Sequence, residues 1–91
     1  MSSKIIVTVL GKDQSGIVAK VSGALANNSC NIEDISQTLM DDIFSMIMLV
    51  AIDEAKIKID ELKNLLLKLG EKLNLKITVQ HEDVFRFMHR V

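Results

Sequence analysis

Residues 10–18 read Leu-Gly-Lys-Asp-Gln-Ser-Gly-Ile-Val and join an apolar run to an amphipathic segment. Gly11 can turn the chain sharply at the end of a strand, because a residue without Cβ can take positive φ. Asp13 and Ser15 are suitable N-caps for a following helix, since their side-chain oxygens accept hydrogen bonds from its first free N–H groups. The stretch therefore predicts a strand that turns directly into a helix.

The same turn is suited to binding an anion. Gly16 leaves the start of the helix without a side chain, so a ligand can reach the backbone directly. Free amides and the positive end of the helix dipole favour a carboxylate or a phosphate at such a place. Two interpretations therefore remain open, a capped strand-to-helix turn and a ligand site.

Four strands are predicted around this turn. Residues 4–10 are apolar at nearly every position and rich in β-branched side chains, which is typical of a strand buried on both faces. Residues 43–52 contain only one polar residue and predict a second central strand. Residues 31–40 and 75–80 carry scattered or alternating polar side chains, so we expect both to be edge strands.

Helices are predicted between these strands. The first is expected from about Gly16 to Asn27, and Gly23 within it predicts close packing on the sheet or contact with a partner. The second is expected to be capped by Asp53, with Gly70 bending or fraying its last turn. Its buried stripe is formed by Ala55, Ile59, Leu62, Leu66, Leu69 and Leu73, while Leu65 and Leu67 interrupt its polar side.

A short C-terminal helix is predicted over residues 82–91, with Val84, Phe85 and Met88 on one side. The element order is then β-α-β-β-α-β within a single domain of residues 1–91. This order predicts an α+β, ferredoxin-like fold, with a four-stranded antiparallel sheet of order 4-1-3-2 and both main helices on one face. The two strands that are apolar on both faces are the two that this order places centrally.

The other face of such a sheet would expose Ile, Val and Met side chains to water. A large apolar patch of this kind usually marks an interface, so we expect a homodimer or a higher oligomer. Met40, Met46, Met48 and Met88 are expected to fill the core or that interface.

Composition argues against several classes of function. The net charge is −1 and aromatic residues make up 3%, so nucleic acid is not an expected partner. No apolar run is long enough to span a membrane and no leader pattern is present, so we expect a cytoplasmic protein without a membrane partner. Cys30 is the only cysteine and is expected to be an inert, small apolar residue.

Catalytic and metal-binding patterns are also missing. The sequence shows no Ser-His-Asp or Cys-His constellation, and the Gly11-x4-Gly16 spacing lacks the Lys-Ser/Thr of a phosphate loop. His81 and His89 lie eight residues apart, without a recognised metal-ligand spacing. Asp34, Asp41 and Asp42 are better explained by a turn than by paired carboxylates. We therefore expect no enzyme, no cofactor and no metal.

Three segments of the chain resemble the ACT domain, in particular the stand-alone single-domain ACT proteins of bacteria and archaea. These segments are residues 11–18, the Cys-Asn-Ile of residues 30–32, and the Thr-Val-Gln-His-Glu-Asp-Val-Phe of residues 78–85. The resemblance covers nearly the whole chain. It implies that the protein regulates by binding an amino acid or a related small molecule at a subunit interface, without catalysis.

The resemblance also implies a set of ligand-binding residues. Asp13 would meet an α-ammonium group, and the amides of Gly16, Ile17 and Val18 would face a carboxylate. Asn31 and Ile32 of a neighbouring subunit would line the far side. The full candidate set is Gly11, Asp13, Gln14, Ser15, Gly16, Ile17, Val18, Asn31 and Ile32.

Alternatives remain open at this stage. Asp13 can serve only as a helix cap, and Asn31 can serve only to stabilise a turn. The whole chain can instead be a protein-interaction module that docks on a metabolic enzyme or a transcription regulator without a ligand. A small enzyme of the same architecture is a third alternative, which would require a titratable pair in a cleft.

Overall fold

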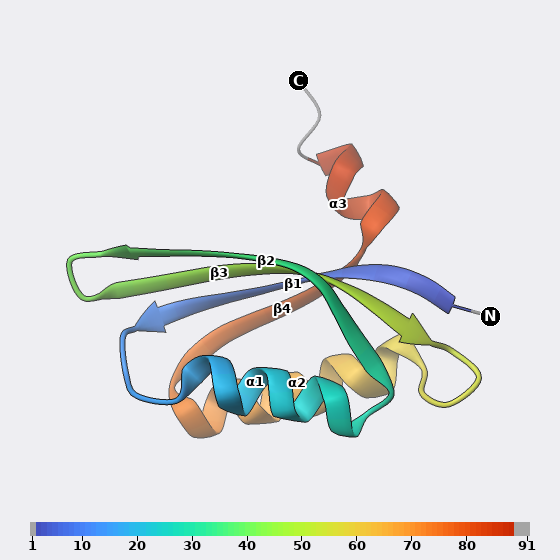
Figure 1. The fold of residues 1–91 in the computed structure, drawn as a ribbon, viewed down its shortest axis with the longest axis horizontal. Helices are drawn as coiled ribbons and strands as arrows, with labels where there is room; N and C mark the ends of the chain where they lie inside the picture. The colour runs from blue at the N-terminus through green and yellow to red at the C-terminus, as the bar shows by residue number, and fades with distance from the viewer. Residues whose placement is uncertain (1, 89–91) are drawn as a thin grey trace.

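A computed structural model describes residues 2–88 and shows four strands and three helices (Figure 1). In chain order they are β1 (Ser2–Lys12), α1 (Ile17–Asn27), β2 (Cys30–Met40), β3 (Ile43–Asp53), α2 (Ile59–Leu73), β4 (Leu75–His81) and α3 (Glu82–Met88). The sheet order is β2-β3-β1-β4 and every neighbouring pair is antiparallel. The predicted fold and strand order are confirmed.

The helices lie on both faces of the sheet. Figure 1 shows α1 and α2 side by side on one face and α3 on the opposite face. The main core lies between the sheet and the first two helices, because alternate residues of the central strands point toward them. That core includes Ile5, Val7 and Val9 of β1, Met46, Met48 and Val50 of β3, Val21 and Leu25 of α1, and Leu62 and Leu66 of α2.

The sheet face opposite α1 and α2 is partly apolar, and α3 covers only one region of it. α3 packs against β1 and β4, and Ile6 is buried on this face, while Leu10, Ile43 and Ile47 stay exposed. The prediction that isoleucines are exposed on this face is therefore confirmed for Ile43 and Ile47. The prediction that valines lie there is wrong for β1 and β3, because the valines of both strands point into the core.

The glycine of the strand end has a different role from the predicted turn. Gly11 lies within β1, where it is paired with Phe44 and Leu75. A Cβ at position 11 would lie 2.6 Å from Leu75 Cδ2, so Gly11 permits the close approach of β4. The positive φ belongs instead to Gly16, at 79°.

The two helical glycines also differ from expectation. A Cβ at Gly23 would meet nothing within 4 Å, so the prediction that Gly23 packs closely on the sheet is wrong. α2 continues past Gly70 to Leu73, so its last turn is not frayed. A Cβ at Gly70 would lie 2.7 Å from the carbonyl oxygen of Leu75, so this glycine lets α2 cross close to β4.

Both predicted helix caps are wrong. Gly16 is the N-cap of α1 and no side chain caps this helix, so neither Asp13 nor Ser15 has that role. Lys58 is the N-cap of α2, five residues after the predicted Asp53.

Asp53 ends β3, where it is paired with Ser2. Its carboxylate then accepts a hydrogen bond from the Ala55 N–H at 3.1 Å, and its carbonyl accepts from the N–H groups of Lys56 and Ile57. This turn carries Ile57 into the core before α2 begins. Ala55 consequently lies outside the helix whose stripe it was expected to join.

Candidate functional site

Two hydrogen bonds fix the loop between β1 and α1. The Asp13 N–H donates to the Asp42 carbonyl at 2.7 Å, which attaches the loop to the turn between β2 and β3. Gln14 Nε2 donates to the Leu73 carbonyl at 2.8 Å, at the last residue of α2. Because α2 leaves its final carbonyls without helical partners, Gln14 satisfies one of them. The loop is therefore held by two elements that are distant in sequence.

The start of α1 has free backbone donors. The first helical hydrogen bond runs from the Lys20 N–H to the Gly16 carbonyl at 2.9 Å, so the amides of residues 17–19 have no helical acceptor. No side chain caps them, and the first turn contains no acidic residue. The positive end of this helix is thus not neutralised locally, as binding of an anion requires.

Asp13 adds a carboxylate to the loop that leads into this helix. It is exposed, as are Gln14, Ser15 and Gly16. Within residues 2–88 the Asp13 carboxylate makes no hydrogen bond and no ion pair, so only its backbone is engaged. Ile17 is buried, whereas Gly16 before it is exposed and Val18 after it is half-buried. The loop therefore carries an acceptor for a cation, and the helix that follows it begins with donors for an anion.

The structure does not bring the whole candidate set together within one chain. Asn31 and Ile32 lie at the start of β2, beyond the far end of α1. The eleven residues of α1 put about 16 Å between its two ends. Asn31 is exposed and Ile32 is half-buried against the core. They line an open groove together with Ala19, Ser22, Gly23, Ala26 and Cys30.

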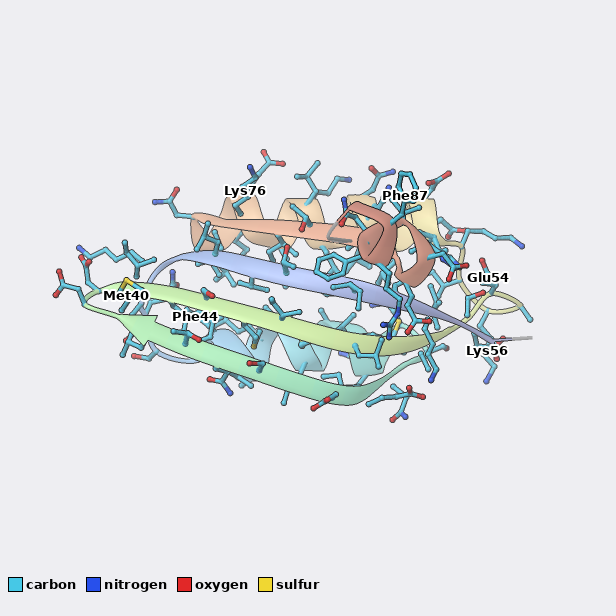
Figure 2. All side chains as sticks on the ribbon, turned by 90° about the horizontal axis from the view of Figure 1, so that it is seen from above. Met40, Phe44, Glu54, Lys56, Lys76 and Phe87 are labelled. Atoms are coloured by element: carbon cyan, nitrogen blue, oxygen red, sulfur yellow. The ribbon has the colours of Figure 1, made fainter. Side chains whose placement is uncertain are left out.

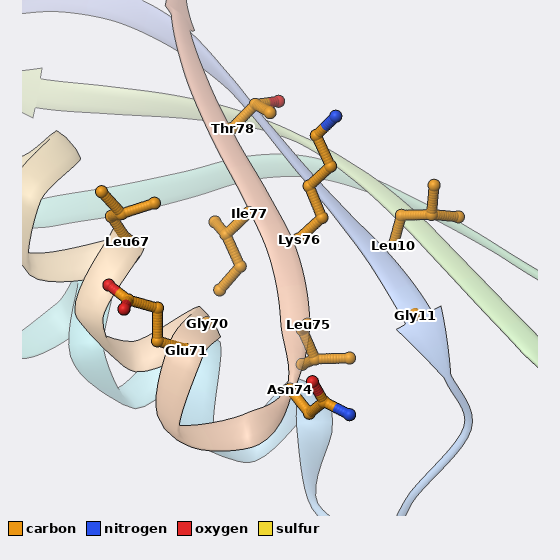
Figure 3. A pocket seen from close by; sticks show the side chains of 10 residues that line it. All are labelled: Leu10, Gly11, Leu67, Gly70, Glu71, Asn74, Leu75, Lys76, Ile77 and Thr78. Carbon is orange, nitrogen blue, oxygen red and sulfur yellow. The ribbon is translucent and has the colours of Figure 1, made fainter.

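Sequence reasoning missed a second groove, which Figure 3 shows beside β4. Leu10, Leu67, Leu75 and Ile77 supply apolar lining, and Glu71 and Lys76 supply charge. One signal in the sequence pointed to it, namely the leucine at position 67 on the otherwise polar side of α2. Its side chain is 54% exposed and forms one wall of this groove.

Cys30 is a free thiol that donates a hydrogen bond to the Asn28 carbonyl at 3.4 Å. Burial raises the pKa of this thiol, so the reactive thiolate is disfavoured at neutral pH. This agrees with the expected inert role.

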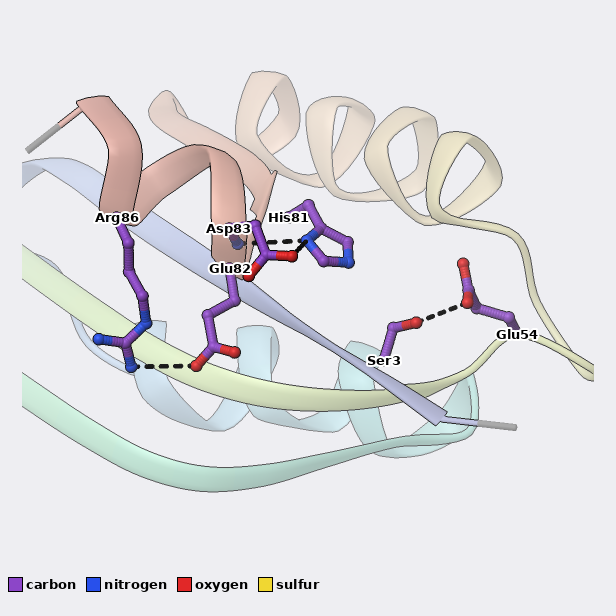
Figure 4. Close-up of polar contacts among 6 residues, drawn as sticks. All are labelled: Ser3, Glu54, His81, Glu82, Asp83 and Arg86. Carbon is purple, nitrogen blue, oxygen red and sulfur yellow. Dashed lines mark hydrogen bonds and ion pairs between the residues drawn. The ribbon is translucent and has the colours of Figure 1, made fainter.

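His81 is one of the two histidines of the sequence. Its Nδ1 accepts a hydrogen bond from the Asp83 N–H at 3.2 Å (Figure 4). His89 lies outside the described residues, and residues 2–88 contain no group of three or more His, Cys, Asp or Glu side chains that could hold a metal ion.

No helix in the described part of the chain is both long enough and apolar enough to cross a membrane.

Replacing Gln14 with alanine is expected to lower the free energy of unfolding by about 0.5–1.5 kcal/mol, because the Leu73 carbonyl loses its side-chain donor. Ser15→Ala is the matched control, since Ser15 makes no capping bond and is expected to stay within about 0.5 kcal/mol of the parent. Urea unfolding followed by circular dichroism measures both. Equal stabilities of the two variants would contradict the assigned role of Gln14.

Comparison with known proteins identifies relatives over nearly the full length. The ACT domain family profile matches residues 3–80. The UPF0237 protein of Methanocaldococcus jannaschii is 53% identical over 89 residues, which cover 98% of this chain and 99% of that protein. The UPF0237 protein of Clostridium perfringens is 48% identical over 86 residues, covering 94% and 97%.

Solved structures give the same assignment. An ACT domain protein from Streptococcus pneumoniae has a TM-score of 0.81 and 47% identity, covering 91% of this chain and 93% of that one. A putative glycine cleavage system transcriptional repressor has a TM-score of 0.79 at 22% identity and is matched over 46% of its chain, which shows a shared fold. The resemblance seen in residues 11–18, 30–32 and 78–85 is thereby confirmed. This chain belongs to the ACT domain family.

Proposed function

We propose that this chain is a cytoplasmic regulatory module that binds an amino acid at an interface between two copies and has no catalytic step of its own. ACT domains are generally regulatory domains that bind small molecules and often oligomerise. Membership of the family supports the class of function. The chemistry of the β1–α1 loop supports the class of ligand.

One observation carries the choice of ligand, namely that the loop with the unpaired Asp13 carboxylate leads directly into the uncapped amides of α1. An amino acid carries an ammonium group and a carboxylate on adjacent carbon atoms. The ammonium group would donate charge-assisted hydrogen bonds to Asp13, and the carboxylate would accept from the amides of Ile17 and Val18. An anion such as phosphate would use only the amides, so the carboxylate of Asp13 favours the zwitterion.

The separation of the candidate residues supports a site between two copies. Within one chain α1 separates the loop from Asn31 and Ile32 by about 16 Å, farther than one small amino acid can span. A second copy that places its Asn31 beside Gly16 would close the open side of the loop. Ligand binding would then strengthen the association of the copies, because each would supply part of the site.

A second candidate function is protein docking without a ligand. The exposed Leu10, Ile43 and Ile47 on the open face of the sheet favour it, since a contiguous apolar patch is typical of an interaction surface. The partner would be a metabolic enzyme or a transcription regulator. A screen for ligands separates this candidate from the first.

Thermal unfolding in the presence of each proteinogenic amino acid tests the proposal. A ligand at one hundred times its dissociation constant adds about 2.7 kcal/mol of stability. For a domain of this size that corresponds to an upward shift of Tm of roughly 10–20 °C. A single hit identifies the ligand, whereas no shift for any amino acid would favour the docking module instead.

Asp13→Ala is then expected to weaken binding of the hit at least about tenfold, because a charged hydrogen bond contributes about 1.5–3 kcal/mol. Asp42→Ala is the matched control. It removes the same charge from the neighbouring turn while the Asp42 carbonyl that holds Asp13 remains. Isothermal titration calorimetry measures both, and an unchanged affinity in Asp13→Ala would contradict the proposed site.

A further inference from the structure

A groove lies between α1 and α2, which pack side by side on the sheet (Figure 1). Its volume is about 500 Å³. α1 buries Val21 and Leu25 against the sheet, so the residues that line the groove come from other sides of this helix. The apolar lining consists of Ala19, Gly23 and Ala24 of α1 and of Leu69 and Leu73 of α2.

Position 23 leaves room in this groove for another molecule. A Cβ at Gly23 would meet nothing within 4 Å. Leu69 and Leu73 are half-buried, so each keeps part of its apolar surface exposed. The axes of packed helices lie about 8–10 Å apart, depending on the side chains at the contact. A helix that enters the groove can therefore approach α1 closely at Gly23 and bury the leucine surface of α2.

Both charged residues that line the groove are lysines. Lys20 is the only charged residue of α1, and Lys72 lies in the last turn of α2. Both side chains are exposed, and within residues 2–88 neither ammonium group makes an ion pair or a hydrogen bond. The groove therefore offers two unpaired cations beside an apolar lining, which suits a molecule with carboxylates next to apolar side chains.

The shape of the groove favours a helix over a small molecule. Sites for small molecules bury about 70–90% of the ligand surface. This groove is open to water, because Ala19, Lys20, Asn27 and Lys72 along it are all exposed. The eight steps along α1 from Ala19 to Asn27 span about 12 Å. That length matches about two turns of an incoming helix, whose apolar anchors would lie at positions i, i+3 or i+4, and i+7.

The C-terminal helix of the same chain does not occupy the groove. α3 lies on the opposite face of the sheet from α1 and α2 (Figure 1). Figure 2 views the sheet from the side of α3 and shows Phe87 on that side, with α1 and α2 behind the sheet. Residues 2–88 therefore leave the groove free for another molecule.

We propose that the groove between α1 and α2 binds an acidic amphipathic helix of a partner protein. The apolar side chains of that helix pack on Gly23 and Leu69, and its carboxylates pair with Lys20 and Lys72. Charge complementarity selects this occupant, because a basic or a neutral helix would leave both lysines unpaired. The groove is then a surface through which this domain acts on another protein.

This docking surface is separate from the exposed patch on the open face of the sheet, but one of its lysines borders the ligand loop. A Cβ at Gly16 would lie 3.7 Å from Lys20 Cε. Substitutions at Gly23 and Lys72 leave Lys20 in place, so they separate docking from ligand binding. The docking proposal does not depend on whether an amino acid binds at Asp13.

Two synthetic peptides test the chemistry of the groove. The probe is a fluorescein-labelled peptide of leucine and glutamate, about 18 residues long, with its leucines on one helical face. We expect it to bind with a dissociation constant of about 1 μM to 1 mM, as measured by fluorescence anisotropy. The same peptide with lysine in place of every glutamate is the control and is expected not to bind. No saturation by the acidic peptide up to about 1 mM, or equal binding of both peptides, would overturn the proposal.

Matched substitutions test the position of the site. Gly23→Leu fills the groove and is expected to raise the dissociation constant of the acidic peptide at least about tenfold, whereas Asn64→Leu places the same side chain on an exposed position of α2 outside the groove. Lys72→Glu is expected to raise the constant at least about fivefold. Lys63→Glu is its control, because the same change nine residues earlier lies on the opposite side of α2. Equal constants within either pair of variants would overturn the proposal.

Two further measurements distinguish other occupants. We expect no binding of phosphatidylglycerol vesicles, and no effect of Lys72→Glu on the sedimentation of the protein alone. Vesicle binding that Lys72→Glu abolishes would assign the groove to an anionic lipid surface, and loss of self-association in this variant would assign it to a second copy. Either result would overturn the proposal. Asp13→Ala is expected to bind the acidic peptide as tightly as the parent, so failure of the ligand site would leave docking intact.

Discussion

Leu66→Ala is expected to lower the free energy of unfolding by about 2–5 kcal/mol. Leu66 is fully buried where α2 packs on the sheet, so its truncation removes apolar contacts and leaves a cavity. Domains of this size have a total stability of only about 5–15 kcal/mol, so the variant is expected to lose a large share of it. Each kcal/mol corresponds to a Tm lower by about 4–8 °C.

Leu67→Ala is the matched control, because it is the same substitution at the next residue of the same helix. Leu67 is more than half exposed, and its truncation is expected to change stability by about 0.5 kcal/mol or less. Both variants are compared in urea at one protein concentration, since association between copies adds to the apparent stability. Similar losses in the two variants would show that the assigned orientation of α2 is wrong.

Gly70→Ala and Gly23→Ala are expected to change stability in opposite directions, although both replace a glycine within a helix. At Gly70 the new Cβ would lie 2.7 Å from the backbone carbonyl of Leu75, which belongs to a paired strand and cannot move freely. The expected loss is about 1–3 kcal/mol, larger than the gain in helix propensity.

At Gly23 the new methyl group meets nothing within 4 Å. The higher helix propensity of alanine is then expected to raise stability by about 0.5–1 kcal/mol. Thermal and urea unfolding of the two variants measure the difference in sign. Destabilisation by Gly23→Ala would mean that this face of α1 is already covered by another molecule, and stabilisation by Gly70→Ala would exclude the close crossing of α2 and β4.

The sequence was sufficient to predict the architecture because hydrophobicity and topology agree. β1 and β3 are apolar on both faces, and only one strand order of a βαββαβ unit places both at the centre. The ends of the elements were less predictable. Asp53 has the sequence signature of a helix cap, but a competing turn with Ala55 and the burial of Ile57 delay the start of α2 to Ile59.

The glycines show why local sequence gives incomplete answers. Gly11 is required by the approach of Leu75, a residue 64 positions away in the chain, and no local pattern records that contact. The positive φ that the sequence predicted at Gly11 occurs instead at Gly16, five residues later. The local prediction of a glycine turn before α1 was therefore nearly right.

The candidate site was predictable only in part, for a related reason. The uncapped amides of α1 could be predicted, because the sequence shows a strand-to-helix turn that ends in a glycine. That Gln14 binds the end of α2 depends on a contact 59 residues distant. The groove beside β4 depends on where α2 places Leu67 relative to β4. In the sequence, only the apolar residue at an expected polar position of α2 indicated this groove.

The irregular pairing of β2 with β3 has a consequence for how this chain can change length during evolution. Ile32 is paired with Val50 and Asp34 with Leu49, so Glu33 is an extra residue that has no partner in the ladder. Side chains alternate along a strand, and the extra residue therefore reverses the parity of everything that follows it. Deleting Glu33 would make the ladder regular and would leave Ile35 paired with Met48 and Leu39 paired with Phe44, on the faces that they now occupy. Loss of Glu33 should consequently be tolerated better than loss of a residue later in this strand, which would shift the rest of the strand by one position against β3.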